Sequence, residues 1–137
     1  MNQQSTHTFL LSLPHVVETL QWGDNLVFWI GDKSVGGKMF ALLNLTPQQG
    51  PIQHGVLSFP TNPERFAELA EQEGLRPAPY FARIGWIALN RWSALSTTDL
   101  QELLTEAHTR TLAKLPRKTR IALGIDPPPP PARRPAR

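Results

Sequence analysis

Short apolar runs alternate with turn-forming residues through the first half of the chain. The clearest pair, residues 26–30 and 39–45, is rich in aromatic and aliphatic side chains and predicts two strands. Eight residues lie between them, of which three are glycine and two are lysine, so the pair predicts a hairpin with an exposed, flexible and basic tip. Weaker patterns predict a short helix over residues 5–13 and strands over residues 16–21, 56–59 and 86–89.

Two further helices are predicted from their end signals. Asn62 is an N-cap followed by proline at the first helical position, and Gly74 supplies a stop after an apolar stripe. Ser96 begins a sequence similar to a capping box, with Asp in the place of the usual Glu. Apolar residues then keep helical spacing up to Pro116, which predicts a long helix over residues 97–115.

Composition suits one domain with a tail. The chain has 137 residues, of which 40% are hydrophobic, so we expect one compact domain over residues 1–120. Residues 121–137 contain five consecutive prolines and three arginines and are expected to form a disordered tail. The absence of cysteine excludes disulfides, thiolate nucleophiles and cysteine-based zinc sites. The chain has no signal-peptide pattern and no apolar run near the roughly 20 residues that span a bilayer, so we expect a cytoplasmic protein without a membrane partner.

Charge is distributed unevenly along the chain. Through Thr109 there are six Lys and Arg against ten Asp and Glu, which gives −4; from Arg110 onward there are eight against one, which gives +7. A basic block of this kind is typical of proteins that bind a polyanion such as nucleic acid. It is equally typical of a tail that serves only solubility, and the charge pattern alone leaves both interpretations open.

No pattern in the chain points to catalysis. The four histidines, at positions 7, 15, 54 and 108, are scattered, and none has a partner at the i, i+4 spacing that places two metal ligands on one helix face. The Gly36-Gly37-Lys38 sequence lacks the glycine and hydroxyl residue that a phosphate-binding loop needs at positions 32 and 39. We therefore expect no enzyme activity, no metal and no cofactor.

The basic and aromatic residues supply candidates for contact with nucleic acid. Positive charge at the end of the long predicted helix interacts favourably with the helix dipole, and this explains two of the basic residues there but not the whole run. Trp92, beside Arg91, is the tryptophan best placed to stack on a base, because Trp29 and Trp86 lie in apolar strands and are expected in the core. The residues expected to bind nucleic acid are Lys33, Lys38, Arg83, Arg91, Trp92, Arg110, Lys114, Arg117, Lys118 and Arg120.

Several short segments together resemble a known family. They are WGDNLVFWI at 22–30, GGKMFALL at 36–43, PAPYFARIGWI at 77–87 and KLPRK at 114–118. In this order they resemble the MmcQ/YjbR family of small bacterial proteins, over roughly residues 13–120. The resemblance implies an α+β fold in which an antiparallel sheet packs against helices, similar to the CyaY/frataxin arrangement. It also implies a double-wing DNA-binding surface, with Lys33 and Lys38 at the tip of one wing.

Two functional hypotheses follow from the residues and the resemblance. The first is a non-enzymatic DNA-binding protein that contacts phosphates through the basic hairpin tip and the basic end of the last predicted helix. The second is a module that binds a protein partner through its proline-rich tail, or a small ligand on a surface between sheet and helix.

Overall fold

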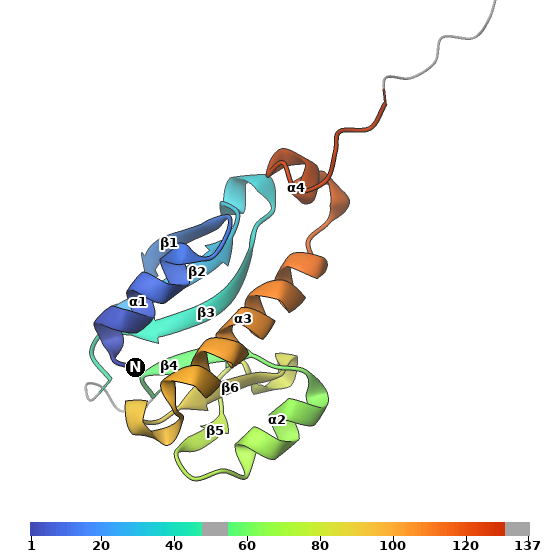
Figure 1. The fold of residues 1–137 in the computed structure, drawn as a ribbon. Coiled ribbons are helices and arrows are strands. Elements are labelled where there is room, and N and C mark those ends of the chain that lie inside the picture. Colours follow the sequence, from blue (N-terminus) through green and yellow to red (C-terminus); the bar gives the residue numbers. More distant parts are fainter. Residues whose placement is uncertain (48–54, 131–137) are drawn as a thin grey trace, which may run out of the picture.

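A computed structural model describes residues 1–47 and 55–130 of the chain (Figure 1). The helices are α1 (Gln3–Ser12), α2 (Pro63–Ala70), α3 (Thr97–Ala113) and α4 (Arg117–Ala122). The strands are β1 (Val16–Gln21), β2 (Asn25–Ile30), β3 (Lys38–Asn44), β4 (Leu57–Pro60), β5 (Leu75–Pro77) and β6 (Trp86–Leu89). Three short 3₁₀ turns are η1 (Lys33–Val35), η2 (Ala82–Ile84) and η3 (Trp92–Ala94).

The strands form one sheet in the order β1-β2-β3-β4-β6-β5, and every neighbouring pair is antiparallel. β1 and β2 pair along their full lengths, from Val16 opposite Ile30 to Gln21 opposite Asn25. The register between β2 and β3 shifts at one position beside Trp29, and such a bulge increases the local twist of a hairpin. This sheet with its helices confirms the predicted α+β class.

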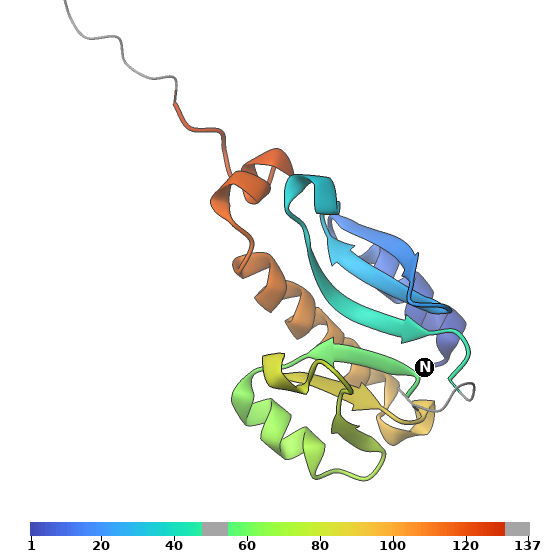
Figure 2. The ribbon, with the colours of Figure 1, turned by 180° about the vertical axis from the view of Figure 1, so that it is seen from behind.

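One face of the sheet carries α1, α2 and α3 and holds the main core, as Figure 1 shows. Leu10 of α1 and Leu69 of α2 are buried there, together with the apolar stripe of α3 and alternate residues of the strands. The opposite face, which is toward the viewer in Figure 2, holds a smaller cluster around Val27 and Trp86. Within the described residues no α-helix covers this second face, which we call the helix-free face.

Local end signals explain where the helices begin. The Asn62 side chain accepts a hydrogen bond from the backbone of Arg65 at 2.8 Å, as an N-cap does. The Ser96 hydroxyl accepts one from the backbone of Asp99 at 3.1 Å. Both helix starts that the sequence predicted are therefore confirmed by their caps. α3 ends two residues earlier than predicted, at Ala113.

His108 lies on the buried face of α3. Its Nε2 is 2.8 Å from the carbonyl oxygen of Pro14, and because that oxygen can only accept, the imidazole donates. The ring also meets Phe40 edge to face. Burial is the largest influence on the pKa of His108 and lowers it below its usual value. The charge of His15 lowers this pKa further, and the hydrogen bond to Pro14 raises it by less than burial lowers it.

Two elements were not predicted. β5 is three residues long and is held by pairing with β6. α4 follows Pro116 directly and continues past residue 120, and Leu123 and Ile125 beyond it pack against the core. The last seven residues of the expected tail, 131–137, and His54 lie outside the described residues.

Candidate nucleic-acid interface

α4 packs against the β2–β3 hairpin tip, which lies far from it in sequence. The Thr119 side chain is only 3% exposed, and its hydroxyl donates to the carbonyl of Gly36 at 3.5 Å. Leu123 lies against Gly31 at the other side of the tip. Gly36 has φ +84°, and a Cβ there would lie 2.5 Å from the Thr119 hydroxyl oxygen. Glycine is therefore required at position 36 both by its backbone conformation and by the approach of α4.

The hairpin tip is a compact turn held by Asp32. The Asp32 carboxylate accepts a hydrogen bond from the backbone N–H of Ser34 at 2.8 Å. The backbone carbonyl of Asp32 accepts another from the backbone N–H of Gly37 at 3.0 Å. The backbone hydrogen bond from Ser34 lowers the pKa of Asp32. The sequence predicted a flexible tip that protrudes; the structure instead has a 3₁₀ turn that α4 contacts on one side.

This contact brings two predicted groups of basic residues to the same end of the molecule, as both ribbon views show (Figures 1 and 2). All members of the group are exposed, and within residues 1–47 and 55–130 none makes an ion pair or a side-chain hydrogen bond. We call them the basic end: Lys33 and Lys38 from the tip, Lys114 after α3, and Arg117 and Lys118 from α4.

Other predicted contact residues lie elsewhere. Arg83 is exposed in η2, on the other half of the sheet. Arg91 forms an ion pair with Glu73 at 3.1 Å, near the start of α3 and thus at the opposite end of that helix from the basic end. Trp92 is partly buried and packs against the main core, and its stacking on a base stays a prediction. Arg110 is half-buried and borders a shallow cavity of about 370 Å³ between α3 and residues 60–62, which precede α2.

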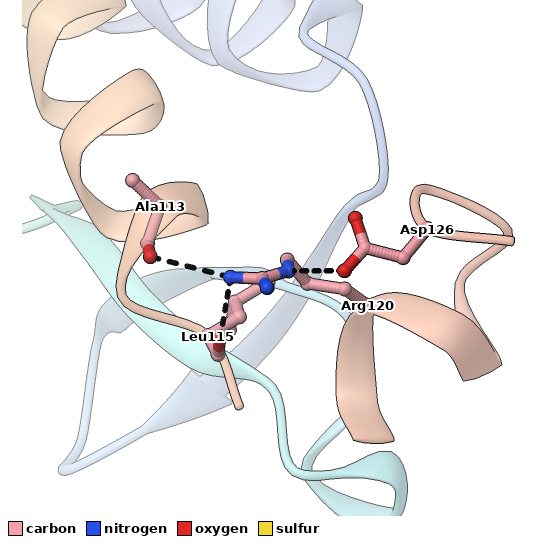
Figure 3. Close-up of polar contacts among 4 residues, drawn as sticks. All are labelled: Ala113, Leu115, Arg120 and Asp126. Carbon is pink, nitrogen blue, oxygen red and sulfur yellow. Dashed lines mark hydrogen bonds and ion pairs between the residues drawn. The ribbon is translucent and has the colours of Figure 1, made fainter. Parts of the chain in front are cut away.

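Arg120 was predicted to contact phosphate, but its guanidinium is engaged in hydrogen bonds within the fold (Figure 3). Its Nε donates to the carboxylate of Asp126 at 2.8 Å, and its Nη1 donates to the carbonyl of Leu115 at 3.2 Å and to that of Ala113 at 3.5 Å. Arg120 therefore satisfies backbone carbonyls at the end of α3, which have no partner within the helix. The side chain belongs to the structural cap and is not part of the basic end.

Sequence reasoning could not find the residues that hold α4 against the hairpin tip. Thr119 carries no charge, and Gly36 was interpreted only as a turn residue. The double glycine at 36–37 was a signal for close approach of another segment, but nothing in the sequence named α4 as that segment. A second feature, a cleft on the helix-free face between Trp22 and Tyr80, also escaped prediction.

The described residues contain neither a metal-ligand cluster nor a membrane-spanning helix. Within residues 1–47 and 55–130, no three His, Cys, Asp or Glu side chains gather in a way that could hold a metal ion. Among the same residues, no helix has both the length and the apolar character needed to cross a membrane.

Comparisons with known proteins agree with the fold. The crystal structure of Deinococcus radiodurans protein DR2400, which has the domain DUF419, is similar at a TM-score of 0.74 and 26% identity, over 90% of this chain and 88% of that chain. A search of curated proteins gave no match. The sequence profile of the YjbR family matches residues 11–110, which is more than half of the chain. The chain therefore belongs to the YjbR family, as the resemblance of its short segments indicated.

Proposed function

We propose that this protein binds DNA without catalysing a reaction, and that the basic end contacts the phosphate backbone. The observation that carries the proposal is the packing of α4 against the hairpin tip, which gathers Lys33, Lys38, Lys114, Arg117 and Lys118 at one end. Five exposed cations that have no acidic partner among the described residues are suited to contact several phosphates in a row.

The charge of the rest of the chain also favours contact between DNA and the basic end. Residues 1–109 carry a net −4, although they include the two lysines of the tip, so the remainder of that segment is more acidic still. A polyanion is repelled by the acidic part and attracted to the basic end, which steers its approach. Two acidic groups on the same segments as the basic end are both engaged, Asp32 in the tip turn and Asp126 with Arg120.

The chemistry of the basic end favours backbone contact over base reading. Lysine is a compact charge on a flexible stem and suits phosphate oxygens, and phosphate contacts position a protein on DNA without selecting a sequence. Binding through these residues is therefore expected to be salt-dependent and largely independent of sequence. If all five contact phosphates, log K against log salt should have a slope of about −4.5 on duplex DNA.

The test is a salt series with labelled duplex DNA and single neutral variants. Lys33→Gln on the tip and Lys118→Gln on α4 should each reduce the slope by about 0.9 and weaken binding, and the double variant should add the two effects. Arg83→Gln is the matched control, because Arg83 is exposed and forms no ion pair with the described residues, but lies outside the basic end. If Arg83→Gln weakened DNA binding as much as the variants of the basic end, DNA would be attracted to any exposed cation, and the assignment to the basic end would be refuted.

The second hypothesis, docking through the proline-rich tail, is separated by truncation. Removing residues 127–137 takes away six prolines and three arginines but keeps Asp126, so the cap on Arg120 is preserved. DNA binding through the basic end should survive with a shallower salt slope. Complete loss of binding after this truncation would place the binding function in the tail.

A further inference from the structure

A cavity of about 720 Å³ lies beside the segment that joins β6 to α3. Its walls come from residues just before β4, from the edge strand β5 and from the segment after β6. Among the residues that line it are Val56, Arg76, Asn90, Arg91 and Trp92. α3 has 17 residues and so spans about 25 Å, and the basic end lies beyond its other end. The cavity is therefore separate from the basic end.

Backbone hydrogen bonds and core packing fix the walls of this cavity. The N–H of Val56 donates to the carbonyl of Leu89 at 2.7 Å. The N–H of Asn90 donates to the carbonyl of Gly74, also at 2.7 Å. Val56 belongs to the main core, and the Trp92 side chain packs against that core. The apolar wall and the segment after β6 are thus parts of the folded sheet, so the cavity is largely pre-formed, as small-molecule sites usually are.

Two arginines from neighbouring parts of the sheet border the cavity. Arg76 lies in β5, which pairs with β6 so that Leu75 is opposite Leu89. Arg91 follows Leu89 by two residues, so this pairing brings both arginines to the same cavity. Gly74 has φ +86°, and a Cβ there would lie 3.3 Å from the Arg91 Cζ. The missing side chain at this position leaves room for the Arg91 guanidinium.

The positive charge of Arg76 is not neutralised within the fold. Among residues 1–47 and 55–130 its half-buried side chain makes no ion pair, and its Nε is buried without a hydrogen-bond partner. A cation in this position has lost part of its hydration without gaining an acceptor. The Nε itself is out of reach of a ligand, but the guanidinium charge is delocalised, so an anion in the cavity would stabilise the whole group.

Arg91 has a partner that an anion could replace. Its Nη2 lies 3.1 Å from the Oε1 of Glu73, but the Glu73 side chain is 90% exposed and that of Arg91 is 51% exposed. An ion pair so exposed to water contributes little, and one contact leaves most of the five N–H donors of the guanidinium for another ligand. Within the described part of the chain no carboxylate lines the cavity, so two positive charges border it without a negative one.

The donors and the size of the cavity indicate the class of ligand. Two guanidiniums and the side-chain amide of Asn90 offer many N–H groups to an oxygen-rich anion. A phosphate monoester has about −1.5 to −2 charges at neutral pH and three acceptor oxygens, which suits two cations better than the single charge of a carboxylate. The cavity is larger than a phosphate group needs, and Val56 and Trp92 supply an apolar wall for the rest of the ligand.

We propose that the cavity binds a small phosphate monoester, with the phosphate beside Arg76 and Arg91 and the rest of the ligand against Val56 and Trp92. Mononucleotides and other phosphorylated small molecules have this chemistry. The proposal gives Arg91 and Trp92, which lie away from the basic end, a role of their own. It stands on the cavity and does not require the basic end to bind DNA.

The experiment uses ¹⁵N-labelled full-length protein and follows the Trp92 indole N–H signal by NMR, assigned with Trp92→Phe. Titrations use inorganic phosphate, adenosine monophosphate, glycerol phosphate, adenosine and acetate. At least one of the two monoesters should shift the signal at a lower concentration than inorganic phosphate does, because its body adds contact with the apolar wall. Adenosine, which lacks the phosphate, should bind much more weakly. If neither monoester moves the signal at millimolar concentration, or if acetate moves it as readily, the proposal is overturned.

Variants locate the phosphate and separate binding from folding. Arg76→Gln and Arg91→Gln should each weaken binding of the monoester by about tenfold or more, because each removes a charged donor. Arg91 is exposed and its variant should fold, which keeps the test decisive if Arg76→Gln is unstable. Glu73→Gln should strengthen binding, because it releases Arg91, and a purely structural role would not produce this gain. Arg83→Gln is the control, because Arg83 is exposed but outside the cavity. Unchanged affinity in Arg91→Gln and Glu73→Gln would refute the site.

A double variant of the basic end separates the two sites. Phosphate is also attracted to exposed lysines, so Lys33→Gln combined with Lys118→Gln is titrated in the same way. The cavity should keep its affinity for the monoester in this variant. If the Trp92 shift is lost there but persists in Arg76→Gln and Arg91→Gln, the phosphate binds at the basic end. That result would refute the cavity site and leave the DNA-binding proposal standing.

Discussion

Replacing Arg120 should destabilise the domain without removing a phosphate contact. The side chain is 28% exposed and its partner Asp126 is 29% exposed, so the ion pair is partly screened by water. The bonds at 2.8 Å to Asp126 and at 3.2 Å to the Leu115 carbonyl have good length, whereas the bond at 3.5 Å to Ala113 is at the limit. Taking about 1 kcal/mol for each of the two good bonds, we expect Arg120→Ala to lower the free energy of unfolding by about 2 kcal/mol.

Urea denaturation of a double-mutant cycle checks this magnitude. Asp126→Ala removes only the ion pair and should cost about 1 kcal/mol, and the double variant should cost less than the sum of the two single variants, because they share that pair. Lys118→Ala is the control on the same helix. The Lys118 side chain is exposed and has no partner in the part of the chain that the structure describes, so its loss should change the free energy of unfolding by less than about 0.5 kcal/mol.

DNA binding by the same variants tests the assignment from the other side. At concentrations of urea near zero, where both variants are folded, Lys118→Ala should weaken binding and Arg120→Ala should leave the salt slope unchanged. The reverse result, with Arg120→Ala as stable as the parent protein but weaker in DNA binding, would mean that Arg120 contacts phosphate. The reasoning from the cap would then be refuted.

Three further predictions concern the hairpin tip and the buried histidine. Gly37→Ala should destabilise by more than about 3 kcal/mol in urea denaturation, because its Cβ would lie 1.9 Å from the backbone oxygen of Gly31. Gly36→Val should move α4 off the tip, since its side chain would collide with Thr119, and should reduce the salt slope of DNA binding although no charge changes. Burial lowers the pKa of His108, so the unfolded chain takes up a proton at higher pH than the folded domain, and stability falls as the pH drops below about 6.5. In thermal melts, the stability of the His108→Gln variant should therefore fall less between pH 7 and pH 5 than that of the parent protein.

The elements that the sequence predicted are those whose signals are local. β1, the β2–β3 hairpin, α2 and the start of α3 each have a periodic pattern or a cap within a few residues. β5 has only three residues, too few for a pattern to appear, and it exists because β6 offers a paired edge. α4 was hidden because it follows a proline and is rich in basic residues, which by themselves resemble the beginning of a solvated tail.

The site was less predictable than the fold because its residues meet only in three dimensions. Thr119 and Gly36 are 83 positions apart, and a single sequence holds no sign of their contact. Lys118 and Arg120 are two positions apart in one basic run, yet Lys118 is exposed and Arg120 is half-buried and hydrogen-bonded in a cap. Successive helical positions are separated by about 100°, so neighbours of equal charge have unrelated surroundings. The composition of this run gives the number of its cations, but not which of them are exposed and which are engaged within the fold.

The basic end therefore depends on geometry as much as on charge. α4 has six residues, its first residue follows Pro116, and no side chain caps its start, so an isolated helix of this length would not persist in water. Thr119 and Leu123 hold it against the tip, and Arg120 ties it to the end of α3. Removing the contacts with the tip would leave the five cations on two separate segments, each with fewer charges than a run of phosphates can use. The uncharged residues that seat α4 are for this reason as much a part of the proposed interface as the lysines themselves.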